Sequence, residues 1–341
     1  MRKDVLVVIL VLLAMKSVVL FTALGEVSLR DFCLRWDGEH FLHVLQGNPE
    51  DYEIVFAPLY PLTAGLLTHI GIRPWLALFI TANVFSIVPP LMALRLWGRR
   101  EALFLVLNPA YALFTTAPYS ESLALSLLLL SYLALVENRP VLSGLLAGLG
   151  VMARYNLVIF AGVVFLYLLA KDRRAAAGFL IPLSLTGIVM LLYLTPHGGI
   201  GAYFAAERYW DLHWTDPLGQ ARWILRSWFT AQGWMLEDNP LYPWHWLVRN
   251  WLFISVYLAG LLILIREKRG LEFAISAPFV FFQMVVTGTP AISTPRLLLP
   301  AIPAQVAVGR ALDECVFIFL FPISLLATHY ATLWHVQAFF G

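Results

Sequence analysis

Residues 5–24 read VLVVILVLLAMKSVVLFTAL, a stretch of 20 mostly apolar residues that decides the fold class. A helix rises about 1.5 Å per residue, so this stretch is long enough to cross a hydrocarbon core about 30 Å thick. Basic residues in 1–3 favour a cytoplasmic N-terminus, and Lys16 is expected to snorkel toward the outer surface. The run exceeds the usual core of a signal peptide. We therefore expect a retained anchor, although residues 23–25 offer a weak cleavage site.

The rest of the chain repeats this apolar pattern. The 341 residues are 60% hydrophobic and only 13% charged, with a mean hydropathy of +0.77. Further apolar runs lie at 75–97, 102–117, 123–136, 141–153, 157–170, 175–194, 251–265, 271–287, 297–312 and 315–334. We predict a single integral domain over residues 1–341, an all-α polytopic membrane protein with about ten or eleven transmembrane helices. The net charge of +2 is too small to predict a nucleic-acid partner.

Basic clusters predict the orientation of these helices, because loops on the cytoplasmic side carry an excess of Lys and Arg. The clusters lie at residues 2–3, 95–100, 171–174 and 266–269. If the runs alternate, the outer face receives residues 25–72, 118–121 and 195–250. Residues 57–71 must then form a re-entrant segment or a half-helix. The Trp-rich region 195–250 is expected to be an external, aromatic interfacial loop.

Charge is concentrated in the first external loop, residues 25–72, where we expect the catalytic chemistry. Residues 35–41 of this loop read RWDGEHF. Ser28 and Asp31 form a capping-box pattern, and the apolar residues that follow recur at helical spacing, which predicts amphipathic helices on the membrane surface. Gly38 interrupts this pattern, so Asp37 is expected at a break between two short interfacial helices, where its carboxylate can point into a cleft. Alternatively, Asp37 caps the second helix.

Several motifs, taken in order, resemble the PIG-V family. They are Trp-Asp-Gly-x-x-Phe at 36–41, FAPLYP at 56–61, NPA at 108–110, APYSES at 117–122, LLAG at 145–148, ARYN at 153–156 and, more faintly, TPRLL at 294–298. Eukaryotic members of this family are the second mannosyltransferase of GPI-anchor assembly. The resemblance implies a GT-C-type helical bundle. It also implies a glycosyltransferase that takes a sugar from a polyprenyl phosphate, inverts the anomeric centre and carries its catalytic acid in the first external loop.

An inverting transfer needs one carboxylate to accept the proton of the incoming hydroxyl, whereas a retaining transfer needs a second as nucleophile. The phosphate leaving group requires positive charge or oriented donors instead of a general acid. By the family's Trp-Asp motif, Asp37 is the expected base. Glu39 is either a rival base or a solvated side chain. Arg154 and Arg296 lie on the predicted outer side, against the positive-inside bias, so each either binds the donor phosphate or pairs with an inward-facing acid.

Three further residues of the predicted site have two interpretations each. His40 lies one helical turn after Asp37 and either orients this acid or binds a sugar hydroxyl. Glu121 opens an apolar helix, where it contributes to the site or only interacts with the helix dipole. Tyr60 either contacts a ligand or anchors the re-entrant segment at the interface.

His40 and His43 also permit a metal site, completed by Asp37 or Glu39 and suited to Mn or Mg. We favour a site without a metal or other cofactor. A phosphate carried by a lipid needs less help from a metal than a nucleotide phosphate does, and the loop contains no Asp-x-Asp pair.

The resemblance therefore predicts transfer of mannose from a dolichyl- or polyprenyl-phosphate donor to a glycolipid or membrane-bound glycan acceptor, among membrane lipids. The chain contains no Asn-x-Ser/Thr sequence, which favours a prokaryotic cell membrane over the ER membrane. One alternative function is a lipid or glycolipid transporter or flippase, in which buried charges at broken helices bind cargo. Another is a non-catalytic relative that acts in glycan assembly.

Overall fold

The computed structural model describes residues 2–209, 213–214, 242–287 and 293–337. Within these ranges, one two-residue antiparallel pairing joins β1 (His213–Trp214) to β2 (Val286–Thr287), and every other regular element is helical. The prediction of an all-α architecture is confirmed for this part of the chain. Most of the predicted external loop 195–250 lies outside the described residues.

Five helical spans are long and apolar enough to cross a membrane. They are α1 (Arg2–Glu26), α5 (Pro74–Phe85) with α6 (Val88–Leu96), α12 (Arg173–Leu194) with η3 (Thr195–His197), the Arg249–Arg266 part of α15 (Tyr242–Arg266), and α20 (Glu314–Gln337). Five such spans indicate an integral multi-pass membrane protein.

Shorter helices occupy the remaining apolar runs. They are α7 (Arg99–Val106), α8 (Pro109–Phe114), α9 (Glu121–Val136), α10 (Pro140–Ala153), η2 (Tyr155–Leu157), α11 (Val158–Lys171), α13 (Gly199–Tyr209), α16 (Gly270–Val285), α18 (Thr294–Leu297) and α19 (Ile302–Ala311). Prolines and caps account for many of their boundaries. For example, Asn108 caps α8 by accepting a hydrogen bond from the Ala110 backbone N–H at 2.9 Å, and Pro109 fills the first helical position.

The first external loop of the sequence analysis folds into short helices. They are α2 (Leu29–Cys33), α3 (Asp37–Gln46), η1 (Asp51–Val55) and α4 (Leu59–Thr68). The expected break between two short helices is present just before Asp37, between α2 and α3. Gly38 does not cause this break, because it lies inside the first turn of α3. α4 has 10 residues, hence a length of about 15 Å, which is half of a bilayer core and agrees with the predicted half-helix.

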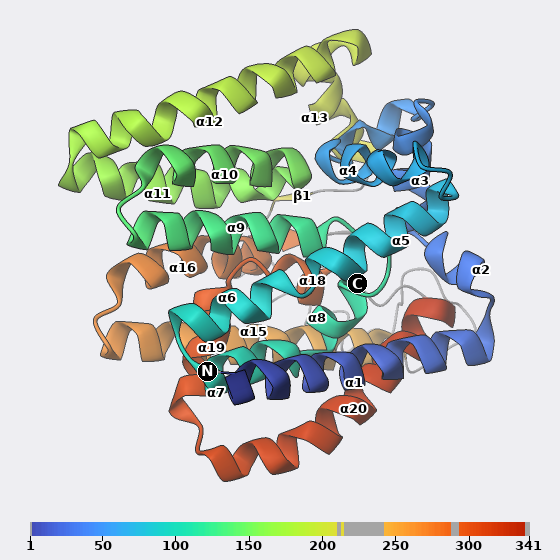
Figure 1. Ribbon diagram of the computed structural model, residues 1–341, viewed down its shortest axis with the longest axis vertical. Helices are drawn as coiled ribbons and strands as arrows, with labels where there is room; N and C mark the ends of the chain where they lie inside the picture. Colours follow the sequence, from blue (N-terminus) through green and yellow to red (C-terminus); the bar gives the residue numbers. More distant parts are fainter. Residues whose placement is uncertain (1, 210–212, 215–241, 288–292, 338–341) are drawn as a thin grey trace.

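Most of the long helices run side by side, and small residues allow their close contact (Figure 1). α10 packs against both α9 and α12. At Gly148 of α10, an added Cβ would lie only 1.9 Å from the Thr186 hydroxyl of α12. Small residues at a crossing are typical of membrane helices, since dispersion contacts rather than water exclusion hold such helices together.

Three of the spanning helices expose large apolar side chains along much of their length. On α1 these include Leu6, Leu10 and Leu13, with α12 and α20 contributing Ile181, Leu185, Ile188, Ile318, Phe319, Ile323 and Leu326. A soluble protein rarely exposes apolar surface on this scale. The exposed faces therefore fit contact with lipid tails.

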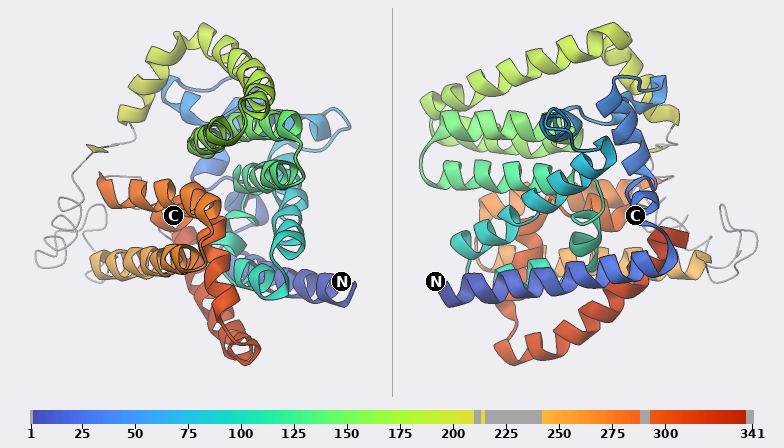
Figure 2. Two further views of the ribbon diagram at one scale, coloured as in Figure 1. Left: turned by 90° about the vertical axis from the view of Figure 1, so that its left-hand side faces the viewer. Right: turned by 45° about the vertical axis from the view of Figure 1, so that its right-hand side comes forward.

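The two ends of the helical bundle carry different segments of the chain. The N-terminus lies at one end and the α2–α3 loop at the other (Figures 1 and 2). The predicted basic clusters gather at the N-terminal end, where Arg99 lies 3.9 Å from Asp4 and Arg95 pairs with Glu137. The sequence analysis assumed that successive apolar runs cross in alternating directions, and basic clusters at one end of the bundle agree with that assumption.

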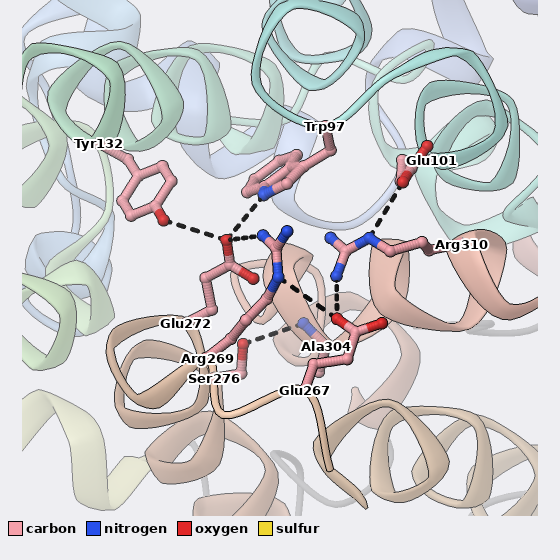
Figure 3. A network of polar contacts seen from close by, with 9 residues as sticks. All are labelled: Trp97, Glu101, Tyr132, Glu267, Arg269, Glu272, Ser276, Ala304 and Arg310. Atoms are coloured by element: carbon pink, nitrogen blue, oxygen red, sulfur yellow. Dashed lines mark hydrogen bonds and ion pairs between the residues drawn. The ribbon is translucent and has the colours of Figure 1, made fainter. Parts of the chain in front are cut away.

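A polar network neutralises buried charge at that same end (Figure 3). Glu272 Oε1 accepts hydrogen bonds from Arg269 at 2.8 Å, Trp97 at 2.9 Å and Tyr132 at 3.2 Å. Arg310 donates to Glu101 at 3.1 Å and also pairs with Glu267. The network joins α6, α7, α9, α15, α16 and α19 at the end opposite to Asp37.

Candidate functional site

Asp37 is the first residue of α3, and the chain reaches it through a backbone conformation that few residues adopt. Trp36 precedes it at φ 52°, one of three positive-φ residues other than glycine in the described chain. Such a conformation costs about 1–3 kcal/mol and persists where the surroundings enforce it. Here the Trp36 indole donates a hydrogen bond to the His335 carbonyl of α20 at 2.9 Å. Trp36 is itself the N-cap residue of α3 and Asp37 is the first residue inside the helix, so the capping interpretation is wrong.

Gly38 allows α3 to begin directly against α2. A Cβ at this position would lie 2.1 Å from the Cys33 carbonyl oxygen and 3.2 Å from Pro118 Cγ. Only glycine fits this contact without movement of the backbone. Gly38 thus fixes the position of its neighbour Asp37 relative to α2 and the segment before α9.

Arg296 reaches Asp37 from a distant part of the sequence. The Arg296 guanidinium Nη1 donates to Asp37 Oδ2 at 2.5 Å. Arg296 lies on the short helix α18, and the two side chains are 13% and 15% exposed. A charge-assisted hydrogen bond of this kind is strong, and it gives each charge a partner in a region with little water.

Glu121 connects this pair to a second arginine. Arg154, which follows α10, forms an ion pair with Glu121 Oε1, and Arg296 Nε lies 3.4 Å from the same oxygen. Glu121 is the first residue of α9 and is only 2% exposed. We call Asp37, Glu121, Arg154 and Arg296 the charged quartet. The ion-pair interpretation of both arginines is confirmed, and Glu121 interacts with side chains as well as with its own helix.

Aromatic residues pack against the Arg296 side of the quartet. Arg296 lies over the rings of Tyr119, at 5.3 Å from the centroid, and Phe114, at 5.9 Å. The His335 ring packs edge-on against Phe114 and Tyr119. Such faces favour a cation, and they exclude water from the charges.

Buried polar atoms without a hydrogen-bond partner among the described residues gather around the same place. They are Tyr119 Oη, Glu121 Oε2, Arg296 Nε and both ring nitrogens of His335. Tyr119 and His335 are fully buried. Most buried polar groups in proteins are hydrogen-bonded, so a group of exceptions in one region points to a polar ligand or to ordered water.

Lys16 supports this region from within the membrane span α1. Its ammonium donates to Thr115 O at 2.6 Å, Asn83 Oδ1 at 2.8 Å and Thr116 Oγ1 at 3.2 Å. Since the side chain is only 7% exposed, the prediction that Lys16 snorkels is wrong. The three acceptors hold the ammonium inside, just before the segment that leads to Glu121.

The remaining predicted residues lie apart from the quartet. Glu39 is exposed, as its solvated interpretation expects. Tyr60 is fully buried and donates to the Leu78 carbonyl at 2.8 Å, so it anchors α4 on α5 within the protein core instead of at an interface. His40 Nδ1 lies 2.5 Å from Glu53 Oε1. This nitrogen therefore contacts Glu53 and does not orient Asp37.

Sequence reasoning did not assign roles to Glu53, Tyr119 or His335. Burial alone opposes ionisation of Glu53, but hydrogen bonds from the Glu50 backbone and from the His40 and His43 rings outweigh it and lower the pKa of Glu53. A signal for Tyr119 was present, because it lies inside the APYSES motif. His335 belongs to the last apolar helix, and no local pattern distinguishes it from a core histidine.

No protein-family model matches this chain, and no curated protein matches it.

Proposed function

We propose that this chain is an inverting glycosyltransferase of the GT-C type, with Asp37 as general base. It transfers mannose from a dolichyl- or polyprenyl-phosphate donor to a lipid-linked or membrane-bound glycan. The observation that carries the proposal is the charged quartet. Residues chosen from four separate motifs, for base catalysis and for phosphate binding, meet at one end of the bundle.

In the proposed reaction, Asp37 accepts the proton of the acceptor hydroxyl while that oxygen attacks the anomeric carbon. The bond from this carbon to the phosphate oxygen breaks, and the electron pair leaves with the polyprenyl phosphate. Arg296 and Arg154 stabilise the negative charge that develops on the phosphate. When the donor phosphate engages Arg296, the guanidinium turns from Asp37 toward the phosphate and the carboxylate becomes available as a base.

The local charge balance supports an anionic donor. The quartet is neutral by itself, with two carboxylates and two guanidinium groups. A donor phosphate would therefore take the place of Asp37 as the anionic partner of Arg296, so that each guanidinium group keeps a negative partner.

The same proposal places the N-terminus in the cytoplasm and the quartet on the external face of a prokaryotic cell membrane. The basic clusters at the N-terminal end of the bundle support this orientation. The apolar faces of α1, α12 and α20 support access by a lipid-linked donor from the bilayer.

A turnover assay tests the proposal. Wild-type protein, Asp37→Asn and Glu39→Gln are compared in membranes that supply acceptors, with radiolabelled polyprenyl-phosphate mannose as donor. Glu39→Gln is the matched control, because it removes an exposed carboxylate from the same helix turn. We expect Asp37→Asn to lower transfer by about 10²–10⁴-fold and Glu39→Gln to leave it unchanged. Transfer by Asp37→Asn at the wild-type rate would refute the role of Asp37, and donor binding without turnover by the wild type would favour a transporter.

A further inference from the structure

Glu53 brings two histidines of α3 together outside the charged quartet. His40 Nδ1 and His43 Nδ1 lie 2.5 and 2.8 Å from the same carboxylate oxygen, Glu53 Oε1. The histidines are three positions apart, so they lie on one side of α3, and η1 supplies the carboxylate from across the loop. Ligand atoms of these three residues lie within 4.8 Å of one another.

Glu53 and His40 are held in place by contacts that do not use this shared oxygen. The second carboxylate oxygen, Glu53 Oε2, accepts a hydrogen bond from the Glu50 backbone N–H at 2.8 Å, and Glu53 is fully buried. The His40 ring stacks on Phe56 with a centroid distance of 4.9 Å and packs edge-on against Tyr52. Supporting contacts of this kind fix the orientation of ligands in metal sites.

We infer that His40, His43 and Glu53 form a binding site for a divalent transition metal, Zn²⁺ by preference. Two imidazoles and one carboxylate are a frequent protein ligand set for zinc, with a further position left for water. The histidines are 19% and 30% exposed, so the side of the site away from Glu53 is open to a fourth ligand. Imidazole ligands favour zinc and its neighbours over Mg²⁺ and Ca²⁺.

The geometry requires little movement to accept the ion. Neighbouring ligand atoms around tetrahedral zinc are about 3.3 Å apart, given zinc–ligand bonds of about 2.0 Å. The nitrogen-to-oxygen distances of 2.5 and 2.8 Å must therefore increase by less than about 1 Å. Small rotations of the His40 and His43 side chains, both of which are partly exposed, can provide this.

The metal would link α3, the helix that begins with Asp37, to η1. Asp37 begins α3 one turn before His40, and η1 is held from its other side by Tyr52, which stacks on Tyr209 of α13 at 4.3 Å. Tyr155 donates to the Ile54 carbonyl of η1 at 3.2 Å. A bond from both histidines to the metal and from the metal to Glu53 would connect α3, η1 and α13 as one unit. This role is independent of the proposed mannose transfer.

The test measures metal binding directly, so its result does not depend on turnover. Untagged full-length protein in detergent is stripped with a chelator and titrated with Zn²⁺ against a chromophoric competitor. His43→Ala removes a partly exposed ligand, and Glu53→Gln removes the buried one. His69→Ala is the control, because His69 is exposed at the end of α4 and its ring nitrogen Nδ1 lies 2.7 Å from the Gly65 carbonyl of the same helix.

We expect one Zn²⁺ per chain for the wild type and for His69→Ala, with a rise in melting temperature on binding. We expect a loss of affinity of about tenfold or more for His43→Ala and Glu53→Gln. Co²⁺ should show the intense visible absorption of a four-coordinate site in the wild type and lose it in His43→Ala. The melting temperature without metal shows whether each variant is folded. Failure of the wild type to bind one equivalent, or equal binding by His43→Ala, would overturn the inference.

Discussion

Arg296 Nη1 lies 2.5 Å from Asp37 Oδ2, although 259 positions separate the two residues in the sequence. The contact joins α3, the second helix after the N-terminal span α1, to the short helix α18 near the end of the chain. It makes Asp37 part of a charge cluster instead of an isolated acid on the membrane surface. The proposed base, Asp37, and a residue of the proposed phosphate site, Arg296, are therefore partners in one ion pair.

Arg296→Lys is predicted to weaken binding of the polyprenyl-phosphate donor and to leave the fold largely unchanged. Lysine keeps the positive charge but loses the planar fork that reaches Asp37 and Glu121 together. We expect the KM for polyprenyl-phosphate mannose to rise by about tenfold or more. Arg95→Lys is the control, since Arg95 is 60% exposed at the opposite end of the bundle. An unchanged KM in Arg296→Lys would argue against phosphate binding by this residue.

Glu121→Gln is predicted to destabilise the protein, because it leaves Arg154 and part of the Arg296 charge without a carboxylate in a buried setting. Removal of one partner from a buried pair costs about 3–5 kcal/mol, and the partial exposure of Arg154 places the expected value at the lower end. The double variant Glu121→Gln/Arg154→Met should recover part of the loss. Chemical unfolding in detergent measures both effects, and an additive double variant would show that the two side chains are not coupled.

Lys16→Met is predicted to lower the free energy of unfolding by about 1–3 kcal/mol, because it leaves buried acceptors on Asn83 and Thr115 without their donor. Thermal unfolding in detergent provides the measurement. Lys171→Met, which changes an exposed lysine at the end of α11, should stay within about 0.5 kcal/mol of the wild type. Equal stability of the two variants would mean that the contacts of Lys16 contribute nothing measurable.

Gly38→Ala is predicted to displace α3 from α2, because the new methyl group would overlap the Cys33 carbonyl. Overpacking of this kind costs about 1–3 kcal/mol, and the shift would also move Asp37. The matched control is Gly25→Ala, at which nothing lies within 4 Å of an added Cβ and helix propensity favours alanine. We expect lower stability and slower mannose transfer only for Gly38→Ala. Wild-type behaviour of this variant would show that α3 tolerates a shift.

The sequence alone determined the membrane class, the helical architecture and the grouping of charge in residues 25–72. Apolar runs of about 20 residues are a local property, and a bilayer permits few structures other than helices. The prediction of a re-entrant segment or half-helix at residues 57–71 followed from the alternation of basic clusters along the whole chain, and the structure forms a short helix there, α4 (Leu59–Thr68). The choice of Asp37, Glu121, Arg154 and Arg296 as site residues came from motifs, and their roles remain proposals.

Only the tertiary structure decided which of these charges meet. Arg154 and Arg296 each had two possible partners in the sequence, a phosphate or an acid, and pairing with Glu121 and Asp37 depends on how α9, α10 and α18 pack. The same holds for Lys16, whose acceptors lie on other helices, and for Glu53, whose two histidines come from α3. Inside a membrane, a buried charge must find a partner within a few ångströms, and helix packing rather than sequence spacing sets which partner that is.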